Sequence, residues 1–379
     1  MDMICFCHLR WNFVYQRPQH LLSRFAFKFR VFVIEEPLYD AETAFLDKIL
    51  SKEKVWVITP HLPRGLNDRE NILSQQKLIQ DMFAAFEIED YVAWFYTPMA
   101  LDISEALPPA KLIIYDCMDE LSAFKNAPAA LRDKEALLLQ QADLVFTGGY
   151  SLFESKQKLH YSVYPFPSSI DKEHFLKARS PDAIPLDHFC IPHPRIGFFG
   201  VIDERFDSDL IKEVAAAKPE WQFVIIGPTV KIDPSSLPVS RNIHYLGSRS
   251  YDELPSYLGG WDVAMIPFAR NESTRFISPT KTPEYLAGGI PVVSTSIRDV
   301  AKPYAEQGFV YIADEASDFI KGIEWALSIR NNPEWLESVD HFLANISWDI
   351  TWVKMMLLIQ DKLKTKQSRN LIPKQNEYV

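Results

Sequence analysis

Residues around Lys281 have types and spacing that suit the binding of a phosphate group. Thr282 is a good N-cap and Pro283 a good first residue, so we expect a helix to begin there. The first N–H groups of a helix have no partner within it and lie at its positive dipole end, which attracts anions. The side chain of Lys281 adds a positive charge beside this predicted helix start.

The same segment offers groups for a diphosphate joined to a ribose. We expect the diphosphate to lie on Ser278, Thr280 and Lys281. Glu284, in the first turn, is placed to accept hydrogen bonds from ribose hydroxyls. A plain capped helix with an acidic first turn explains the same pattern, so the residues alone leave both interpretations open.

A second candidate site follows the predicted strand Arg195–Phe199. Gly200 permits close backbone approach at the end of that strand, and Arg205 has a side chain suited to phosphate. The segment lacks the G-x-G-x-x-G fingerprint of dinucleotide sites. Gly200 can also serve only to shape a turn, and Arg205 can be a solvated charge among acidic neighbours.

A third candidate follows the first predicted strand. Trp11, Gln16 and Arg17 lie in a loop before a helix that begins near Pro18. An aromatic loop with an arginine suits a sugar or lipid-phosphate acceptor. A packed loop that caps the helix explains the same residues equally well.

Two carboxylates end a later strand. Asp116 and Asp119 lie where catalytic acids and bases are often found, although helix capping is the simpler role for Asp119. The motifs GxSxG, HExxH and GxxxxGK[ST] do not occur in the chain. Their absence weighs against a serine hydrolase, a zinc peptidase and a P-loop NTPase.

Strands and helices that alternate along the chain must position these groups. Near-continuous apolar strands separated by helices predict a doubly wound α/β fold, with parallel sheets covered on both faces. We predict strands at Met3–His8, Arg30–Glu35, Lys54–Thr59, Tyr91–Tyr96, Lys111–Asp116, Asp143–Thr147, Arg195–Phe199, Gln222–Ile226, Ile243–Leu246, Asp262–Ile266, Ile290–Ser294 and Phe309–Ile312.

The predicted elements form two groups separated by a proline-rich stretch. We expect a first domain over residues 1–171, a linker over 172–194 and a second domain over 195–346. Residues 347–379 form a final helix followed by a frayed tail. Open α/β sheets bind ligands at the carboxyl ends of their strands, so the two domains are expected to face each other across a cleft.

Composition narrows the class of protein. The 379 residues suffice for two domains, and 47% of them are hydrophobic, which excludes disorder for most of the chain. A net charge of -10 argues against a nucleic-acid partner. The N-terminus lacks the features of a signal peptide, and we expect no membrane-spanning run of about 18 apolar residues. Four cysteines without a CxxC pair predict no metal site and indicate a cytoplasmic protein.

Taken together, these segments resemble the retaining GT-B-fold glycosyltransferases of the family-4, or glycosyl transferase group 1, type. Within that family they are most similar to a TuaH-like subgroup of teichuronic-acid biosynthesis. The resemblance spans about Met3 to Leu363. It is carried by Trp11, Gln16-Arg-Pro-Gln-His20, Tyr115-Asp-Cys-Met-Asp119, Ile196-Gly-Phe-Phe-Gly200, Ser278-Pro-Thr-Lys281, Glu284-Tyr-Leu-Ala-Gly-Gly-Ile-Pro-Val-Val293 and Ser347-Trp-Asp349.

The resemblance implies two Rossmann-like domains and a nucleotide-sugar donor bound by the second. It implies donor-binding roles for Gly200, Arg205, Ser278, Thr280, Lys281 and Glu284, and acceptor-binding roles for Trp11, Gln16 and Arg17. The acceptor is a glycan or lipid-linked molecule of cell-surface polysaccharide biosynthesis. No cofactor or metal is implied beyond the nucleotide-sugar itself.

One position departs from the family pattern. Glu284 matches the second glutamate of a motif whose first glutamate contacts the transferred sugar, but Phe276 occupies that first position. Glu272 is the nearest acidic substitute. The candidate catalytic residues are therefore Lys281, Glu272, Asp116 and Asp119.

Other functions remain open from the sequence. A sugar-nucleotide epimerase of GT-B fold, a catalytically silent GT-B protein and a clamshell sugar-binding protein share the two-domain plan. A basic tail after Lys362 leaves peripheral contact with the inner membrane face open as well, although a solvated chain end explains it more simply.

Overall fold

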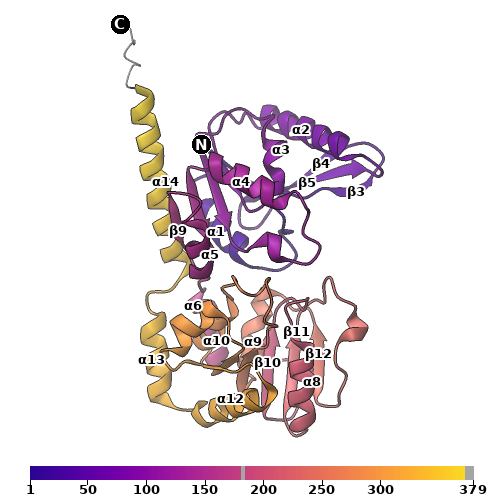
Figure 1. The fold of residues 1–379 in the computed structure, drawn as a ribbon, viewed down its shortest axis with the longest axis vertical. Helices are drawn as coiled ribbons and strands as arrows, with labels where there is room; N and C mark the ends of the chain where they lie inside the picture. The colour runs from indigo at the N-terminus through magenta and orange to yellow at the C-terminus, as the bar shows by residue number, and fades with distance from the viewer. Residues whose placement is uncertain (181–183, 372–379) are drawn as a thin grey trace.

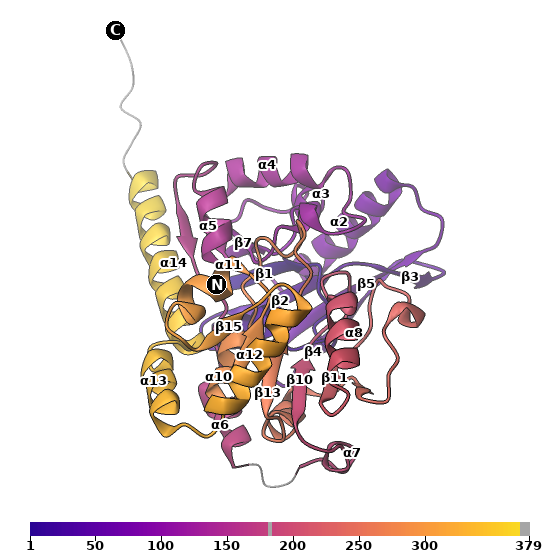
Figure 2. The same cartoon turned by 60° about the horizontal axis from the view of Figure 1, so that its bottom comes forward.

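The computed structural model describes residues 1–180 and 184–371. Two α/β domains, each built on its own sheet, lie one above the other (Figure 1). The chain crosses from the first domain to the second and returns with its last helix, which runs along the side of the first domain. Figure 2 shows the same arrangement from a tilted view.

The first sheet has nine strands in the order β3-β5-β2-β1-β6-β7-β8-β9, with β4 paired to the outer edge of β5. All pairings are parallel except that of β4 with β5, which is antiparallel. The strands are β1 (Asp2–Cys7), β2 (Arg30–Glu35), β3 (Leu38–Ala41), β4 (Phe45–Leu50), β5 (Val55–Pro63), β6 (Tyr91–Phe95), β7 (Leu112–Cys117), β8 (Leu144–Thr147) and β9 (Val163–Pro165). The main helices are α1 (Arg17–Phe25), α2 (Asp68–Ala85), α3 (Leu101–Ser104), α4 (Leu131–Gln141) and α5 (Tyr150–Lys156).

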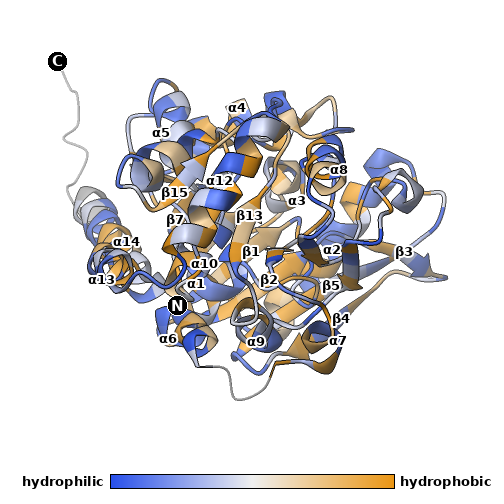
Figure 3. Ribbon diagram, turned by 90° about the horizontal axis from the view of Figure 1, so that it is seen from below, coloured by the Kyte–Doolittle hydropathy of each residue, from blue (hydrophilic) through white to orange (hydrophobic). Residues whose placement is uncertain are grey.

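Both faces of this sheet are buried. Cys5 and Trp94 belong to the core on one face, whereas their chain neighbours Ile4 and Ala93 belong to the core on the other. Successive strand residues point to opposite faces, so near-continuous apolar strands are what a sheet covered on both sides requires. Central strands such as β13 are largely hydrophobic in Figure 3, whereas helices such as α12 change between hydrophobic and hydrophilic along their length.

The second sheet is parallel, with six strands in the order β12-β11-β10-β13-β14-β15. Its strands are β10 (Arg195–Phe199), β11 (Gln222–Ile226), β12 (Ile243–Gly247), β13 (Val263–Ile266), β14 (Val292–Ser294) and β15 (Val310–Ile312). Its main helices are α8 (Ser208–Ala217), α9 (Leu254–Leu258), α10 (Lys281–Ala287), α11 (Arg298–Val300), α12 (Ala316–Ile329) and α13 (Pro333–Leu343).

The described part of the expected linker has more structure than the sequence indicated. It contains α6 (Lys172–Leu176) and α7 (Leu186–Phe189), and Phe175 and Ala178 are buried in the core of the second domain. The prolines stop long helices but still allow these short ones. The start of this segment therefore packs as part of the second domain.

The final helix, α14 (Trp348–Leu371), packs in the core of the first domain through Trp348, Met355 and Ile359. It continues to Leu371, and residues 372–379 of the expected tail lie outside the described residues. By length and hydropathy, one stretch, Pro333–Ser368, is long and apolar enough to cross a membrane. This differs from the sequence-based expectation, and the stretch comprises two helices, α13 and α14.

Candidate active site

A cavity of about 680 Å³ lies between the two domains. The first domain contributes the loop after β1 and the turn between β4 and β5. The second contributes the ends of β10, β11 and β12 and the start of α10, so the carboxyl ends of its parallel strands line the cavity. Seven of the predicted site residues are among its lining: Trp11, Gln16, Gly200, Arg205, Thr280, Lys281 and Glu284.

Two glycines shape the floor of this cavity. Gly200 and Gly227 follow β10 and β11 and have φ angles of 143° and 141°. A Cβ on Gly227 would lie 1.9 Å from the carbonyl oxygen of Gly200. The two backbone segments can therefore approach this closely only because residue 227 has no side chain. A Cβ on Gly200 would lie 2.3 Å from Cε and 2.7 Å from Nζ of Lys281. The space beside Gly200 is therefore where the lysine side chain lies.

The ammonium group of Lys281 has no ion-pair or hydrogen-bond partner among residues 1–180 and 184–371. It lies over the rings of Phe198 and Phe268, at 5.5 and 5.4 Å from their centroids. Burial lowers the pKa of Lys281, and the charge of Arg205 lowers it further. A cation held this way gains electrostatic energy when an anion enters the cavity.

Arg205 supplies a second cation with a different environment. Its Nε and Nη2 donate to both carboxylate oxygens of Asp203, the shortest contact being 2.6 Å. Its guanidinium also lies over Phe124 of the first domain, at 5.4 Å. Asp203 thus fixes the direction of the guanidinium, and Nη1 makes no hydrogen bond within the described part of the chain.

Glu284 is the buried acid of the cavity, with 5% of its surface exposed. Within the described ranges, its carboxylate forms no side-chain hydrogen bond. Burial raises the pKa of Glu284, and the nearby charge of Lys281 lowers it. An acceptor group that lines a cavity and lacks a partner suits the hydroxyls of a ligand.

Tyr251 is a cavity residue that the sequence analysis missed. Its hydroxyl is buried with no hydrogen-bond partner in the described chain, and its ring stacks on His174 and Tyr15 at 4.2 and 4.7 Å. Burial raises the pKa of Tyr251, and the charge of Glu284 adds to the effect. Its position after β12, at the carboxyl edge of the sheet, is the signal that would have identified it.

Asp119 faces the two cations without lining the cavity. Burial raises its pKa to about 6, and the charges of Arg205, Arg17 and Lys281 act in the opposite direction. Its electrostatic environment therefore comes from both domains.

Arg17 and Asp116 form a buried ion pair instead of facing the cleft. Nη2 of Arg17 lies 2.7 Å from Oδ1 of Asp116, Nε lies 3.1 Å from both carboxylate oxygens, and Nη1 donates to the carbonyl oxygen of Phe166. The two residues are 3% and 0% exposed. We therefore correct both assignments: neither the acceptor role of Arg17 nor the catalytic role of Asp116 agrees with side chains that point into the core.

Trp11 and Gln16 do reach the cavity. The backbone N–H of Trp11 donates to Glu35, at 2.7 Å, and its buried side chain forms part of the cavity wall. Gln16 is the N-cap of α1, and its backbone N–H donates to Oε1 of Gln19, at 3.1 Å. Both residues line the same cavity as the second-domain residues, so they lie where the donor was expected.

Two other predicted residues lie elsewhere. The hydroxyl oxygen of Ser278 accepts from the backbone N–H of Ser168, at 3.3 Å, and its carbonyl oxygen accepts from the Ser168 hydroxyl. Ser278 thus joins the two domains and does not line the cavity. Glu272 is 74% exposed, lies 3.8 Å from Arg275 and borders a different cavity, so its position does not match the role of the missing motif glutamate.

The helix start also differs from the prediction. α10 begins at Lys281, with Thr280 as its N-cap, and it has only seven residues. The N–H of Thr282 donates to Pro279, Pro283 has no N–H, and the N–H of Glu284 donates to Thr280. Few N–H groups are left for a phosphate, so side-chain cations must carry most of the anion binding.

Among residues 1–180 and 184–371, no group of three or more His, Cys, Asp or Glu side chains is placed to hold a metal ion. The four cysteines are free, and Cys5, Cys7 and Cys117 are buried in the first domain.

Comparisons with known proteins agree with this architecture. Residues 193–328 match the family described as glycosyl transferases group 1. The putative teichuronic acid biosynthesis glycosyltransferase TuaH of Bacillus subtilis (strain 168) is 26% identical over 284 residues, which cover 69% of this chain and 70% of TuaH.

Solved structures resemble the whole chain. Sucrose-phosphate synthase of Thermosynechococcus elongatus superposes with a TM-score of 0.67 at 13% identity, covering 96% of this chain and all of that one. Anabaena HepE in complex with UDP gives 0.65 at 12% identity, over 95% of this chain and 100% of that one. An E. coli trehalose-6-phosphate structure bound with UDP-2-fluoro glucose superposes with a TM-score of 0.65 at 11% identity, covering 96% of this chain and 99% of that one. The chain is a glycosyltransferase of the GT-B type, and its residues 193–328 match the glycosyl transferases group 1.

Proposed function

We propose that this glycosyltransferase binds a nucleotide-sugar in the cavity between its domains and transfers the sugar to a hydroxyl of a glycan or lipid-linked acceptor. The observation that carries the proposal is the ammonium of Lys281, which lies beside Gly200 and, within the described chain, has carboxylates near it but none in ion-pair or hydrogen-bond contact. The diphosphate lies against Lys281 and Nη1 of Arg205. Glu284 accepts from the ribose hydroxyls, and Tyr251 lies next to it.

Two structural relatives support this ligand class. Anabaena HepE was solved with UDP, and the E. coli trehalose-6-phosphate protein with UDP-2-fluoro glucose. Both share the fold of this chain. A nucleoside diphosphate is therefore the probe with which to begin.

The transfer exchanges one bond for another at the anomeric carbon. The bond to the diphosphate oxygen breaks and leaves its electron pair on the phosphate, while the acceptor oxygen bonds to the same carbon. The acceptor proton passes to the departing phosphate oxygen, and configuration is retained. Lys281 and Arg205 stabilise the charge that builds on the leaving group, which is commonly the largest contribution to catalysis.

Asp119 holds the acceptor hydroxyl in this proposal. Its ionised carboxylate accepts a hydrogen bond from that hydroxyl and so orients it toward the anomeric carbon. The pKa of about 6 keeps the group mostly ionised at neutral pH.

The biological setting is part of the same proposal. The similarity to TuaH supports a role in cell-surface polysaccharide biosynthesis. The proposal places the enzyme on the cytoplasmic side of the membrane, in peripheral contact with it. The reaction needs no metal ion, so EDTA is expected to leave the rate unchanged.

The proposal is tested with Gly200→Ala and a panel of nucleotide-sugars. The new methyl group displaces the Lys281 side chain and strains the backbone, and we expect nucleotide affinity to fall at least tenfold. Gly308→Ala is the matched control: its φ is 77° and nothing lies within 4 Å of the added atom. Equal affinities for both variants contradict the placement, and products formed without an acceptor indicate an epimerase instead.

A further inference from the structure

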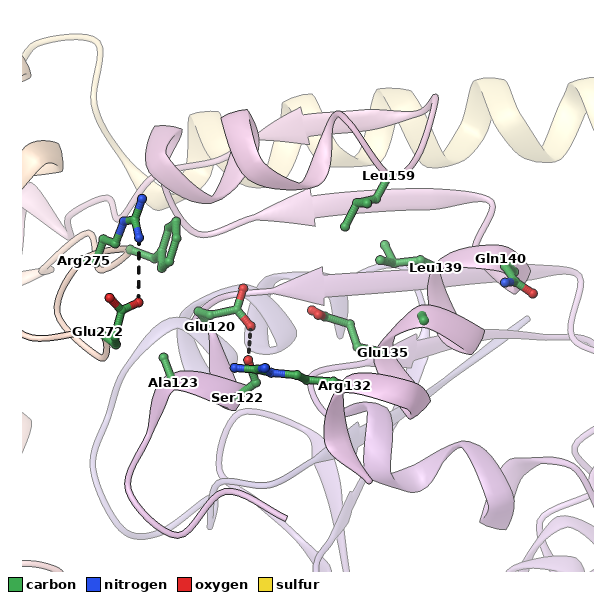
Figure 4. A pocket seen from close by; sticks show the side chains of 12 residues that line it. Glu120, Ser122, Ala123, Arg132, Glu135, Leu139, Gln140, Leu159, Glu272 and Arg275 are labelled. Atoms are coloured by element: carbon green, nitrogen blue, oxygen red, sulfur yellow. Dashed lines mark hydrogen bonds and ion pairs between the residues drawn. The ribbon is translucent and has the colours of Figure 1, made fainter. Parts of the chain in front are cut away.

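A second cavity, of about 760 Å³, lies at the domain interface away from the nucleotide cavity (Figure 4). Its volume falls in the range of about 300–1,000 Å³ that is typical of small-molecule sites. One wall is a face of α4 formed by residues 132, 135, 136, 139 and 140, whose spacing of three and four places them on one side of the helix. The loop Glu272–Phe276 of the second domain closes one end, and Gln140 lies at the other.

Two carboxylates in this cavity are held rigidly. Lys156, whose side chain is 3% exposed, lies 2.8 Å from Glu120 and 2.7 Å from Glu135. The hydroxyl of Tyr115 also donates to Glu135, at 2.7 Å, and Ser122 donates to Glu120, at 2.8 Å. Such a network fixes oxygen acceptors in place before a ligand arrives.

Guanidinium groups and apolar surfaces complete the lining. The side chain of Arg132 makes no hydrogen bond or ion pair within the residues described, and Arg275 lies over the ring of Phe276 at 5.2 Å. Leu139 and Leu159 add aliphatic surface. A sugar ring offers hydroxyls to acceptors and donors and apolar C–H faces to such side chains, so this mixture suits a carbohydrate.

The second cavity is separate from the nucleotide cavity, but residues of the two linings lie close together in the chain. Phe276 lines the second and Thr280 lines the first, and four residues span at most about 14 Å. Glu120 of the second cavity directly follows Asp119, which faces Lys281 and Arg205. These links bring one end of the second cavity near the side of the nucleotide cavity that holds Lys281 and Arg205.

We infer that the α4 cavity binds the acceptor, and that the acceptor is a glycan of two or more sugar units. The face of α4 from Arg132 to Gln140 runs about 12 Å at 1.5 Å per residue, which is longer than one sugar ring. This inference rests on the proposed function. It moves the acceptor away from Trp11 and Gln16, which line the nucleotide cavity.

Two exposed positions on α4 provide the test. Ala136 lines the cavity, whereas Leu137 is 44% exposed and does not. Ala136→Trp fills the cavity without disturbing the core, and Leu137→Trp places the same side chain outside it. The acceptor probes are p-nitrophenyl glycosides of one and two sugar units, and the donor is the nucleotide-sugar that the wild-type enzyme uses.

We expect Ala136→Trp to lower kcat/KM for the disaccharide probe at least tenfold, mainly through KM, and to remove its advantage over the monosaccharide. Nucleotide affinity stays within twofold, and Leu137→Trp matches the wild type throughout. Arg132→Ala, which adds no bulk, raises the same KM. Equal kcat/KM for both tryptophan variants overturns the inference, as does a loss confined to nucleotide affinity. A wild-type enzyme that transfers no sugar overturns the proposed function instead.

Discussion

Arg17 and Lys281 are buried cations at equivalent places, since each lies where a strand of a parallel sheet leads into a helix. Arg17 has its carboxylate partner, Asp116, in a bidentate pair that excludes water. Lys281 has aromatic rings around it and no anion bound to it among the described residues. The fold supplies the counter-ion of Arg17, whereas we expect a bound ligand to supply the contacting anion of Lys281.

This difference separates a structural residue from a binding residue. A buried charge costs free energy unless it is paired, so a protein retains an unpaired one where it gains something else. The pKa of Lys281, lowered by burial and by Arg205, records that cost. Substitution of either cation tests this difference.

The largest expected effect is on stability in the first domain. Arg17→Ala leaves Asp116 buried without a partner and is expected to lower the free energy of unfolding by about 3–5 kcal/mol. Urea unfolding measures the change. The double variant Arg17→Met/Asp116→Leu removes both charges and is expected to recover most of the loss. A single variant as stable as the wild type would contradict a structural role for the pair.

Lys281→Ala is expected to act on turnover and not on the fold. Loss of a group that stabilises the leaving phosphate lowers kcat by about 10²–10³, or about 2.7–4 kcal/mol. Stability is retained, because the folded protein already disfavours the ammonium. Initial rates and urea unfolding are compared with Lys212→Ala, an exposed lysine on α8. If Lys281→Ala has the same kcat as the Lys212→Ala control, Lys281 does not stabilise the leaving group.

Asp119→Asn is expected to raise stability while it lowers activity. The folded protein raises the pKa of this acid to about 6, so it binds the proton more tightly than the unfolded chain does. Stability from this group is therefore present at low pH and lost as pH rises through 6. The neutral amide removes that penalty at pH 7, by up to about 3 kcal/mol.

Activity is expected to rise with the ionisation of Asp119, whereas stability falls with it. The ionised carboxylate orients the acceptor, so kcat/KM is expected to fall below about pH 6 in the wild type and to lose that acid limb in Asp119→Asn. An identical acid limb in both proteins would assign the titration to another group.

The smallest of these effects is expected for Glu284→Gln. The amide keeps one acceptor oxygen for the ribose hydroxyls but replaces the second oxygen with an NH2 group, which weakens the hydrogen bonds by about 1.4 kcal/mol and raises the donor KM about tenfold. Because burial raises the pKa of Glu284, the variant is also expected to be slightly more stable at neutral pH. Steady-state kinetics with varied donor gives the KM, and an unchanged value argues against the ribose contact.

Most strands of the two sheets could be predicted from the sequence, because each is a short run of apolar residues. Each of the twelve predicted strands overlaps a strand of the structure, and β2, β10 and β11 match to the residue. Strands β3, β4 and β9 were missed. β4 is largely exposed at a sheet edge and contains Asp47 and Lys48, so it lacks an apolar pattern.

The site was only partly predictable, since a sequence does not show which charges are paired. Gly200, predicted from its place after a strand, and Lys281 and Glu284, predicted from an expected helix start, do line the cavity between the domains. Arg17 and Asp116 also lie near the ends of predicted strands. They are separated by 98 residues of the chain, however, and form their ion pair only in the folded protein. The α4 cavity gave no signal, because residues from both domains form it.

Calorimetric titration with a panel of nucleoside diphosphates, beginning with UDP, tests the central claim most directly. The account predicts that one of them binds the wild type and the Arg17→Met/Asp116→Leu variant with equal affinity and binds Lys281→Ala at least tenfold more weakly. Equal affinity in Lys281→Ala, or a loss confined to the Arg17 variant, would contradict the assignment of the unpaired cation to ligand binding.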